Sequence, residues 1–226
     1  MKRITLLLAD DHMMVREGFR KMLELEDDFE VIGEAQDGRQ AVEMVKKLRP
    51  AIVLMDIAMP RLNGLEATRQ LAKAVPTTKV LILSAYNDDA YVTNATNAGA
   101  VGYLLKQTSA HDLCRAIREI NSGKPFFSPS ISKRLDRLNR SVPDRSGQQN
   151  KKVARLTSRE MEVLQLIAEG KANKETAVEL GIGIKTVDKH RGHLMTKLDI
   201  HDTAGLTRYA ISAGIIEGCV QLTIVS

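Results

Sequence analysis

The apolar residues up to position 122 gather in short continuous runs that alternate with amphipathic stretches. The runs lack the apolar–polar alternation of a half-solvated strand, which is typical of parallel strands covered by helices on both faces. The expected strands cover 4–9, 29–35, 51–56, 79–85 and 102–106, and the expected helices cover 15–25, 39–48, 64–74, 88–97 and 111–121. This pattern predicts a doubly wound α/β domain with a five-stranded parallel sheet.

The pattern changes after position 155, where the apolar residues recur with helical spacing. A capping box of Thr157 and Glu160 begins the first helix, and Gly170 ends it. Three more helices are expected, one ending at Gly181, one over IKTVDKHRGHLMTKLDI and one over DTAGLTRYAISAGII. The second part is therefore predicted to be a small, separate all-α domain.

A polar segment of different composition joins the two parts. Residues 124–152 are rich in Pro, Ser, Arg and Lys and carry eight basic and two acidic side chains, whereas both flanking parts are nearly neutral. We expect domains at 1–123 and 153–226 with a basic linker at 124–152. Basic charge also attracts phosphate backbones, so this composition fits a solvated linker or a nucleic-acid contact.

Hydropathy and cysteine content bear on the compartment. No apolar stretch approaches the roughly 20 residues of a membrane span, and the apolar run near the start is short and meets two aspartates. Cys114 and Cys219 lack metal-ligand spacing, so buried reduced thiols are expected. We expect a cytoplasmic protein without a membrane partner.

Residues capable of chemistry stand at the ends of four expected strands. The first strand ends in Asp10 and Asp11, the third in Asp56, the fourth in Ser84 and the fifth in Lys106. The carboxyl ends of parallel strands share one edge of an open sheet, so these side chains should converge there. Clustered carboxylates favour a hard cation such as Mg²⁺, which leaves the hydroxyl and the ammonium group to meet an anion beside it.

The segments ADDH, VLMDIAMPRLNG, LILSA and GYLLK, in this order and spacing, resemble the receiver domain of two-component response regulators, over the whole first domain. The resemblance implies a flavodoxin-like fold in which Asp56 attacks a phosphohistidine of a sensor histidine kinase and becomes an aspartyl phosphate. It also implies that Asp10, Asp11, Asp56 and the carbonyl oxygen of Ile57 hold Mg²⁺.

The same resemblance gives roles to three further residues. A carboxylate attacking a phosphoryl group brings two anions together, so the metal and Lys106 would neutralise the developing charge. The phosphoryl group would draw the Ser84 hydroxyl towards itself, and Tyr103 would turn into the space left. A local change of charge would thereby alter the face formed by the fourth and fifth strands and the helix between them.

The segment LTSREMEVLQLIAEGKANKETAVELGIGIKTVDKHRGHLMTKL resembles the helix-turn-helix of NarL/FixJ (LuxR-type) regulators. The resemblance implies that the third helix of this domain enters the major groove of DNA. A period of about 100° per residue places Val187, Leu194 and Leu198 in the core. The opposite side carries Lys185, Asp188, Lys189, Gly192 and Thr196, with His193 at its edge, and Lys174, Thr186, His190 and Lys197 are better placed for phosphates.

Together the two resemblances predict a transcription regulator that is not itself an enzyme. Phosphorylation by a sensor histidine kinase, with Mg²⁺, would control its binding as a dimer to paired operator half-sites, and RNA polymerase is a further candidate partner. The second domain carries no net charge, so modest affinity for DNA is expected of one copy, which favours dimers. We also expect the unphosphorylated receiver to pack over part of the third helix.

Two alternatives belong to other functional classes. One is a Mg²⁺-dependent phosphohydrolase with an aspartate nucleophile, but such enzymes typically carry Asp-x-Asp, and Ala58 stands at the second position. The other is a receiver that signals through protein or RNA contacts alone. Loss of DNA affinity in Lys189→Ala would count against the second alternative.

Overall fold

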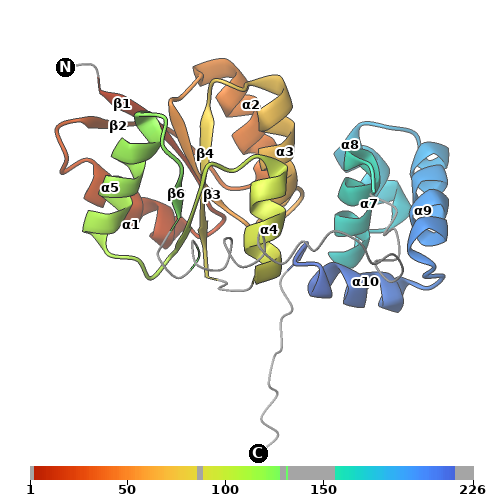
Figure 1. Cartoon of the computed structure of the whole chain (residues 1–226). Coiled ribbons are helices and arrows are strands. Elements are labelled where there is room, and N and C mark those ends of the chain that lie inside the picture. The colour runs from red at the N-terminus through yellow and green to blue at the C-terminus, as the bar shows by residue number, and fades with distance from the viewer. Residues whose placement is uncertain (1–2, 86–88, 128–130, 132–155, 217–226) are drawn as a thin grey trace, which may run out of the picture.

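A computed structural model describes residues 3–85, 89–127, 131 and 156–216 (Figure 1). Within these ranges the first part of the chain forms a parallel sheet of six strands in the order β2-β1-β3-β4-β5-β6. The strands are β1 (Ile4–Ala9), β2 (Phe29–Ala35), β3 (Ile52–Asp56), β4 (Lys79–Ser84), β5 (Gly102–Leu105) and β6 (Phe126–Phe127). The helices of this part are α1 (Met13–Leu23), α2 (Gly38–Leu48), α3 (Gly64–Ala74), α4 (Asp89–Ala98) and α5 (Ala110–Asn121).

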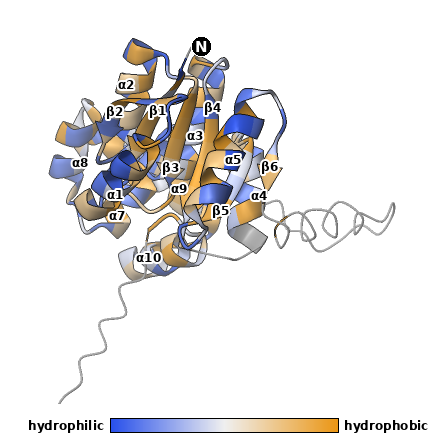
Figure 2. Ribbon diagram, turned by 90° about the vertical axis from the view of Figure 1, so that its left-hand side faces the viewer, coloured by the Kyte–Doolittle hydropathy of each residue, from blue (hydrophilic) through white to orange (hydrophobic). Residues whose placement is uncertain are grey.

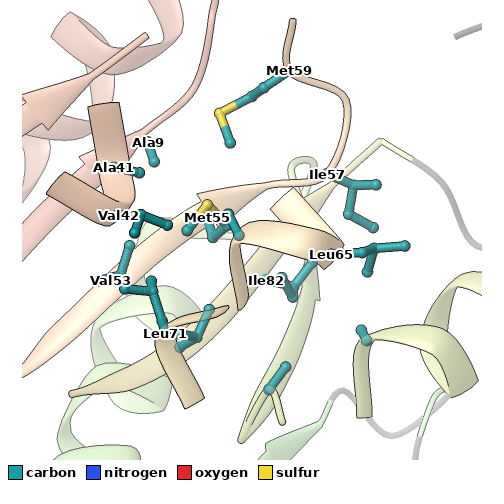
Figure 3. Close-up of a cluster of buried hydrophobic side chains, with 14 of the residues drawn as sticks. Ala9, Ala41, Val42, Val53, Met55, Ile57, Met59, Leu65, Leu71 and Ile82 are labelled. Atoms are coloured by element: carbon teal, nitrogen blue, oxygen red, sulfur yellow. The ribbon is translucent and has the colours of Figure 1, made fainter. Parts of the chain in front are cut away.

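The sheet is covered by helices on both faces, as its apolar strands require. Leu7 and Ala9 of β1 face the core under α2, α3 and α4, part of which Figure 3 shows. Leu6 and Leu8 of the same strand face the core under α1 and α5. Figure 2 shows the strands as an apolar layer between helices whose surfaces are mixed. The predicted doubly wound fold is confirmed.

The sixth strand departs from the predicted five. Phe126 and Phe127 pair in parallel with Gly102 and Tyr103 at the edge of the sheet. Both residues fall in the segment assigned to the linker, most of which lies outside the described residues. A run of two residues is too short to show a strand period, so only its tertiary contacts reveal it.

The second domain contains α7 (Ser158–Ala168), α8 (Asn173–Leu180), α9 (Ile184–Leu198) and α10 (Thr203–Ser212) among its described residues. The predicted capping box is present, since Thr157 accepts a hydrogen bond from the backbone N–H of Glu160 and the Glu160 carboxylate accepts one from that of Thr157. The four helices enclose a core of their own that includes Val187 and Leu194 of α9. No helix in the described ranges has the length and apolar character needed to span a membrane.

Candidate functional site

The side chains predicted at the strand ends meet at the carboxyl edge of the sheet. Asp56, at the end of β3, is only 5% exposed, and Asp10, which follows β1, is also buried. Lys106 follows β5 and places its Nζ 2.7 Å from Asp10 Oδ2 and 2.8 Å from Asp56 Oδ2. One ammonium group thus bridges two carboxylates that come from different strands.

Burial dominates the electrostatics of this site. It raises the pKa of Asp56 to about 6, against the opposing effect of the Lys106 ammonium group, while the negative charge of Asp10 adds to the rise. Burial alone would lower the pKa of Lys106, but its bonds to Asp10 and Asp56 outweigh this effect and hold that pKa above its usual value. The ammonium group is therefore charged at neutral pH, whereas Asp56 takes up a proton in mildly acidic solution.

A group of potential metal ligands lies at the same edge. Ligand atoms of Asp10, Asp11, His12 and Asp56 all lie within 4.8 Å of one another. His12 Nδ1 is 2.9 Å from Asp11 Oδ1, and the backbone N–H of His12 donates to Asp10 Oδ1 at 2.9 Å. Three convergent carboxylates suit a hard divalent cation. His12 is not among the predicted ligands, and its place directly after the aspartate pair is the only sequence signal for it.

The carbonyl oxygen of Ile57, the predicted backbone ligand, is engaged within the loop after β3. This oxygen already accepts two backbone hydrogen bonds, from Gly64 N at 2.8 Å and from Met59 N at 3.1 Å. A carbonyl oxygen has two lone pairs, so this one has none left for a cation in this conformation. A backbone ligand would have to come from another residue, or the loop after β3 would have to rearrange.

Ser84 and Tyr103 occupy the adjacent strands. Ser84 ends β4, is fully buried, and accepts a hydrogen bond at its backbone oxygen from Lys106 N at 2.8 Å. Tyr103 lies in β5, is fully buried, and belongs to the core under α2, α3 and α4. The structure therefore holds Tyr103 in an inward position on the strand next to Ser84.

Gly64 maintains the close approach between the loop after β3 and β3 itself. A Cβ at this position would overlap the carbonyl oxygen of Asp56. We expect Gly64→Ala to lower the free energy of unfolding of the first domain by about 1–3 kcal/mol, because the backbone of β3 must shift. Denaturant unfolding measures this effect.

Gly18→Ala is the matched control for this substitution. Gly18 is a helical residue whose added Cβ would meet nothing within 4 Å. Alanine is the better helix former, so this variant is expected to be as stable as the wild type or up to about 1 kcal/mol more stable. Equal stability of the two variants would show that the β3 contact is not rigid.

The exposed surface of α9 follows the predicted face. Val187 and Leu194 are buried, and Leu198 packs partly buried against the same core. The exposed predicted residues of α9 are Lys185, Thr186, Asp188, Lys189, Gly192, His193, Thr196 and Lys197, while His190 is half-buried and Lys174 of α8 is exposed. The helical period was thus a sufficient guide to the two sides of this helix.

Two of the predicted DNA contacts have protein partners. The carboxylate of Asp188 accepts a hydrogen bond from Asn173 Nδ2 at 2.5 Å, and Arg191 donates to the same asparagine side chain. Lys197 Nζ lies 2.6 Å from the carboxylate of Glu160, the buried member of the capping box. Lys197 thus links α9 to α7 while it stays exposed at the surface, and Asn173 and Arg191 were not predicted.

The expected packing of the receiver over the third helix is wrong for this conformation. The first domain contacts α7 and α8 instead, with Arg39 3.2 Å from Glu162 and within 3.9 Å of Glu179. Figure 1 shows α9 on the side of the second domain that faces away from the sheet. The helix predicted to read DNA is accessible while the two domains are in contact.

Both parts of the chain match known families. Residues 6–118 match the response regulator receiver domain, and residues 154–210 match the bacterial regulatory proteins of the luxR family. The transcriptional regulatory protein LiaR of Bacillus subtilis is 41% identical over 208 residues, which cover 92% of this chain and 96% of that protein. The transcriptional regulatory protein DegU of Brevibacillus brevis is 35% identical over 226 residues, which cover 95% and 96%.

A solved structure extends the similarity to both domains together. RcsB from Salmonella enterica serovar Typhimurium, bound to promoter rprA in the presence of phosphomimetic BeF3-, matches with a TM-score of 0.59 and 26% identity. The match covers 92% of this chain and 98% of the other.

Proposed function

This chain belongs to the two-component response regulators that carry a LuxR-type DNA-binding domain, and on that basis we propose that phosphorylation of Asp56 controls its binding to operator DNA. The observation that carries the proposal is the buried Asp56 carboxylate, bridged to Asp10 by the Lys106 ammonium group at the carboxyl edge of the sheet. The phosphoryl donor in this proposal is a phosphohistidine of a sensor kinase, and the compartment is the cytoplasm.

Asp56 is the nucleophile in the proposed reaction. One of its carboxylate oxygens attacks the phosphorus, the bond from phosphorus to the histidine nitrogen breaks, and the histidine leaves with that electron pair. Lys106 lies 2.8 Å from the carboxylate and is charged, so it can pair with the phosphoryl oxygens as negative charge gathers there. Ser84 and Tyr103 are the proposed switch residues, because Ser84 ends the strand next to that of the nucleophile and Tyr103 lies on the strand beyond it.

Asp10, Asp11 and Asp56 would hold Mg²⁺, and His12 is close enough to join or orient them. When bound, the cation supplies positive charge that offsets the repulsion between carboxylates and phosphoryl oxygens. The proposed division of the chain is a receiver at 1–123 extended by β6, a linker up to 152, and a DNA-binding domain at 153–226.

The proposed DNA contacts lie on α9 and at the start of α8. Lys185, Lys189 and His193 would face bases, with Asp188 held beside them by Asn173, and Lys174, Thr186, His190 and Lys197 would face phosphates. The RcsB structure with promoter DNA and a phosphomimetic supports this assignment for a chain of the same two-domain design. Two copies on paired half-sites, and contact with RNA polymerase, belong to this proposal.

Selection of DNA sites by the full chain, with and without acetyl phosphate in Mg²⁺, tests the whole proposal. Enrichment of a palindromic site by treated wild type, and not by treated Asp56→Ala, is the expected result. Enrichment that is the same for both proteins would show that Asp56 does not control DNA binding.

Lys189→Ala tests the DNA-reading face separately. Lys189 is exposed on α9, and a base contact of a lysine contributes about 1–3 kcal/mol of discrimination, so affinity for the selected site should fall about 5-fold or more. Fluorescence anisotropy at several salt concentrations measures this. Lys46→Ala, which removes the same charge from an exposed position on α2, should leave the affinity unchanged. Equal losses for the two variants would mean that only net charge matters.

A further inference from the structure

The loop that follows Asp56 is held by a side chain from the other domain. Gln165 of α7 is 1% exposed, and its Nε2 donates to the carbonyl oxygen of Met59 at 2.9 Å. Its Oε1 accepts from the backbone N of Asn63 at 2.8 Å and from Asn63 Nδ2 at 3.1 Å. One buried amide therefore binds both ends of the segment between Met59 and Asn63.

A second side chain of α7 binds the middle of the same segment. Glu169 Oε1 accepts from the backbone N of Arg61 at 3.0 Å and from Gln165 Nε2 at 2.8 Å. Three alternate residues of the loop, Met59, Arg61 and Asn63, are thus bound through their backbones. A third side chain of α7, Glu162, bonds to the first domain away from this loop, at Gln70 over 2.9 Å.

The loop held by Gln165 and Glu169 in turn positions the Asp56 carboxylate. The backbone N of Ile57 donates to Asp56 Oδ1 at 2.8 Å, and the Ile57 carbonyl oxygen accepts from Met59 N and Gly64 N. Met59 is anchored from inside, because its side chain is buried in the core that Figure 3 shows. Asn63 also caps α3 through its side chain. Gln165 holds the residues at both ends of this arrangement.

We propose that Gln165 is a positioning residue for the Asp56 site, through which the DNA-binding domain opposes loading of that site. The inference rests on the proposed function. Gln165 makes these bonds while Asp56 carries no phosphoryl group. In this state Lys106 bridges Asp10 and Asp56, and the Ile57 carbonyl oxygen accepts hydrogen bonds from the loop itself. The two oxygens of the Asp56 carboxylate are bonded to Lys106 Nζ and to the backbone N of Ile57, so a phosphoryl group or beryllofluoride on Asp56 displaces at least one of these partners. In this proposal the loop after Ile57 then moves, and that movement breaks the bonds of the buried Gln165 amide. Coupling of this kind is reciprocal, so a loaded site must weaken the contact between the domains by the same factor.

A titration of the full chain with beryllofluoride in Mg²⁺, followed by fluorine NMR, tests this proposal. Gln165→Ala should tighten the apparent affinity roughly 5-fold or more, the lower range of measured couplings between sites. Glu169→Ala, which removes the contact to Arg61, should shift the affinity in the same direction and serves as a second variant if Gln165→Ala does not fold. Amide hydrogen exchange at Arg61 and Asn63 should become faster in both variants.

Gln70→Ala is the matched control. It removes a bond across the same contact, to Glu162, but none to the loop, so its affinity should remain within about 2-fold of the wild type. Unchanged affinity in Gln165→Ala despite faster exchange at Asn63 would overturn the inference. An equal tightening in Gln70→Ala would also overturn it, because the effect would then come from the contact as a whole. Failure of wild type to take up beryllofluoride is a separate result that would reject the proposed function itself.

Discussion

Asp56→Asn is expected to take up no beryllofluoride or phosphoryl group and yet to resist denaturant better than the wild type. The loss of uptake follows from the loss of the nucleophilic oxygen. The gain in stability follows from burial, which raises the pKa of Asp56 to about 6 from the ordinary 3.8. Asparagine resembles the protonated carboxyl group and cannot ionise, so it avoids the cost of a buried charge.

The sign of the pH dependence follows from the direction of this shift. A raised pKa means that the folded protein binds the proton more tightly than the unfolded chain, so this contribution to stability is fully present below pH 3.8 and is lost as the pH rises through 6. The loss approaches about 3 kcal/mol at pH 7, at 1.36 kcal/mol per pH unit. Asp56→Asn should therefore be up to about 3 kcal/mol more stable at pH 7 without Mg²⁺, and no more stable at pH 4.

Denaturant unfolding of the receiver at several pH values, without Mg²⁺, measures this difference. Asp27→Asn removes an exposed carboxylate and should change the stability by no more than about 0.5 kcal/mol at either pH. Equal stability of wild type and Asp56→Asn at pH 7 would show that the Lys106 ammonium group fully offsets the burial of Asp56.

Leu194→Ala is expected to unfold the DNA-binding domain and leave the receiver folded. Leu194 is fully buried in the core of the second domain, and truncation of such a leucine costs about 2–5 kcal/mol. The two cores of the receiver contain no residue of α7 to α10. DNA binding should be lost, whereas beryllofluoride uptake should persist.

Calorimetry of wild type and Leu194→Ala separates the two domains. The variant should lose or shift one thermal transition and keep the transition of the receiver. Ile184→Ala, on the same helix but 47% exposed, should cost less than 1.5 kcal/mol. A single transition that shifts as a whole would show that the polar contact between the domains makes them one cooperative unit.

The sequence predicted those parts of the protein in which hydrophobic positions follow a regular pattern along the chain. Buried parallel strands give continuous apolar runs, so the sheet and the chemistry at its edge, from Asp10 to Lys106, could be located from the order of the strands alone. The helical period likewise separated Val187 and Leu194 from the exposed side of α9. The periodicity of each element depends on residues close together in the chain, and the parallel arrangement of the strands then brings their carboxyl ends to one edge.

The features that the sequence did not reveal depend on distant residues or on the backbone. The orientation of the Ile57 carbonyl is set by Gly64, and residue type does not encode it. Glu162, Gln165 and Glu169 recur at helical spacing on α7, which indicates a polar side but not that its partner is the loop after Asp56. The pairing of Lys197 with Glu160 links two helices that the sequence places 37 residues apart.

The exposed position of α9 bears on the speed of the response. Contacts to phosphates do not depend on base sequence, so a chain with the proposed phosphate contacts Lys174 and Thr186 exposed can bind any stretch of DNA weakly and slide along it. We therefore expect the inactive protein to spend part of its time on the chromosome. Under the proposed function, a signal would then reach regulators already on DNA, and the delay before transcription changes would not include a full three-dimensional search.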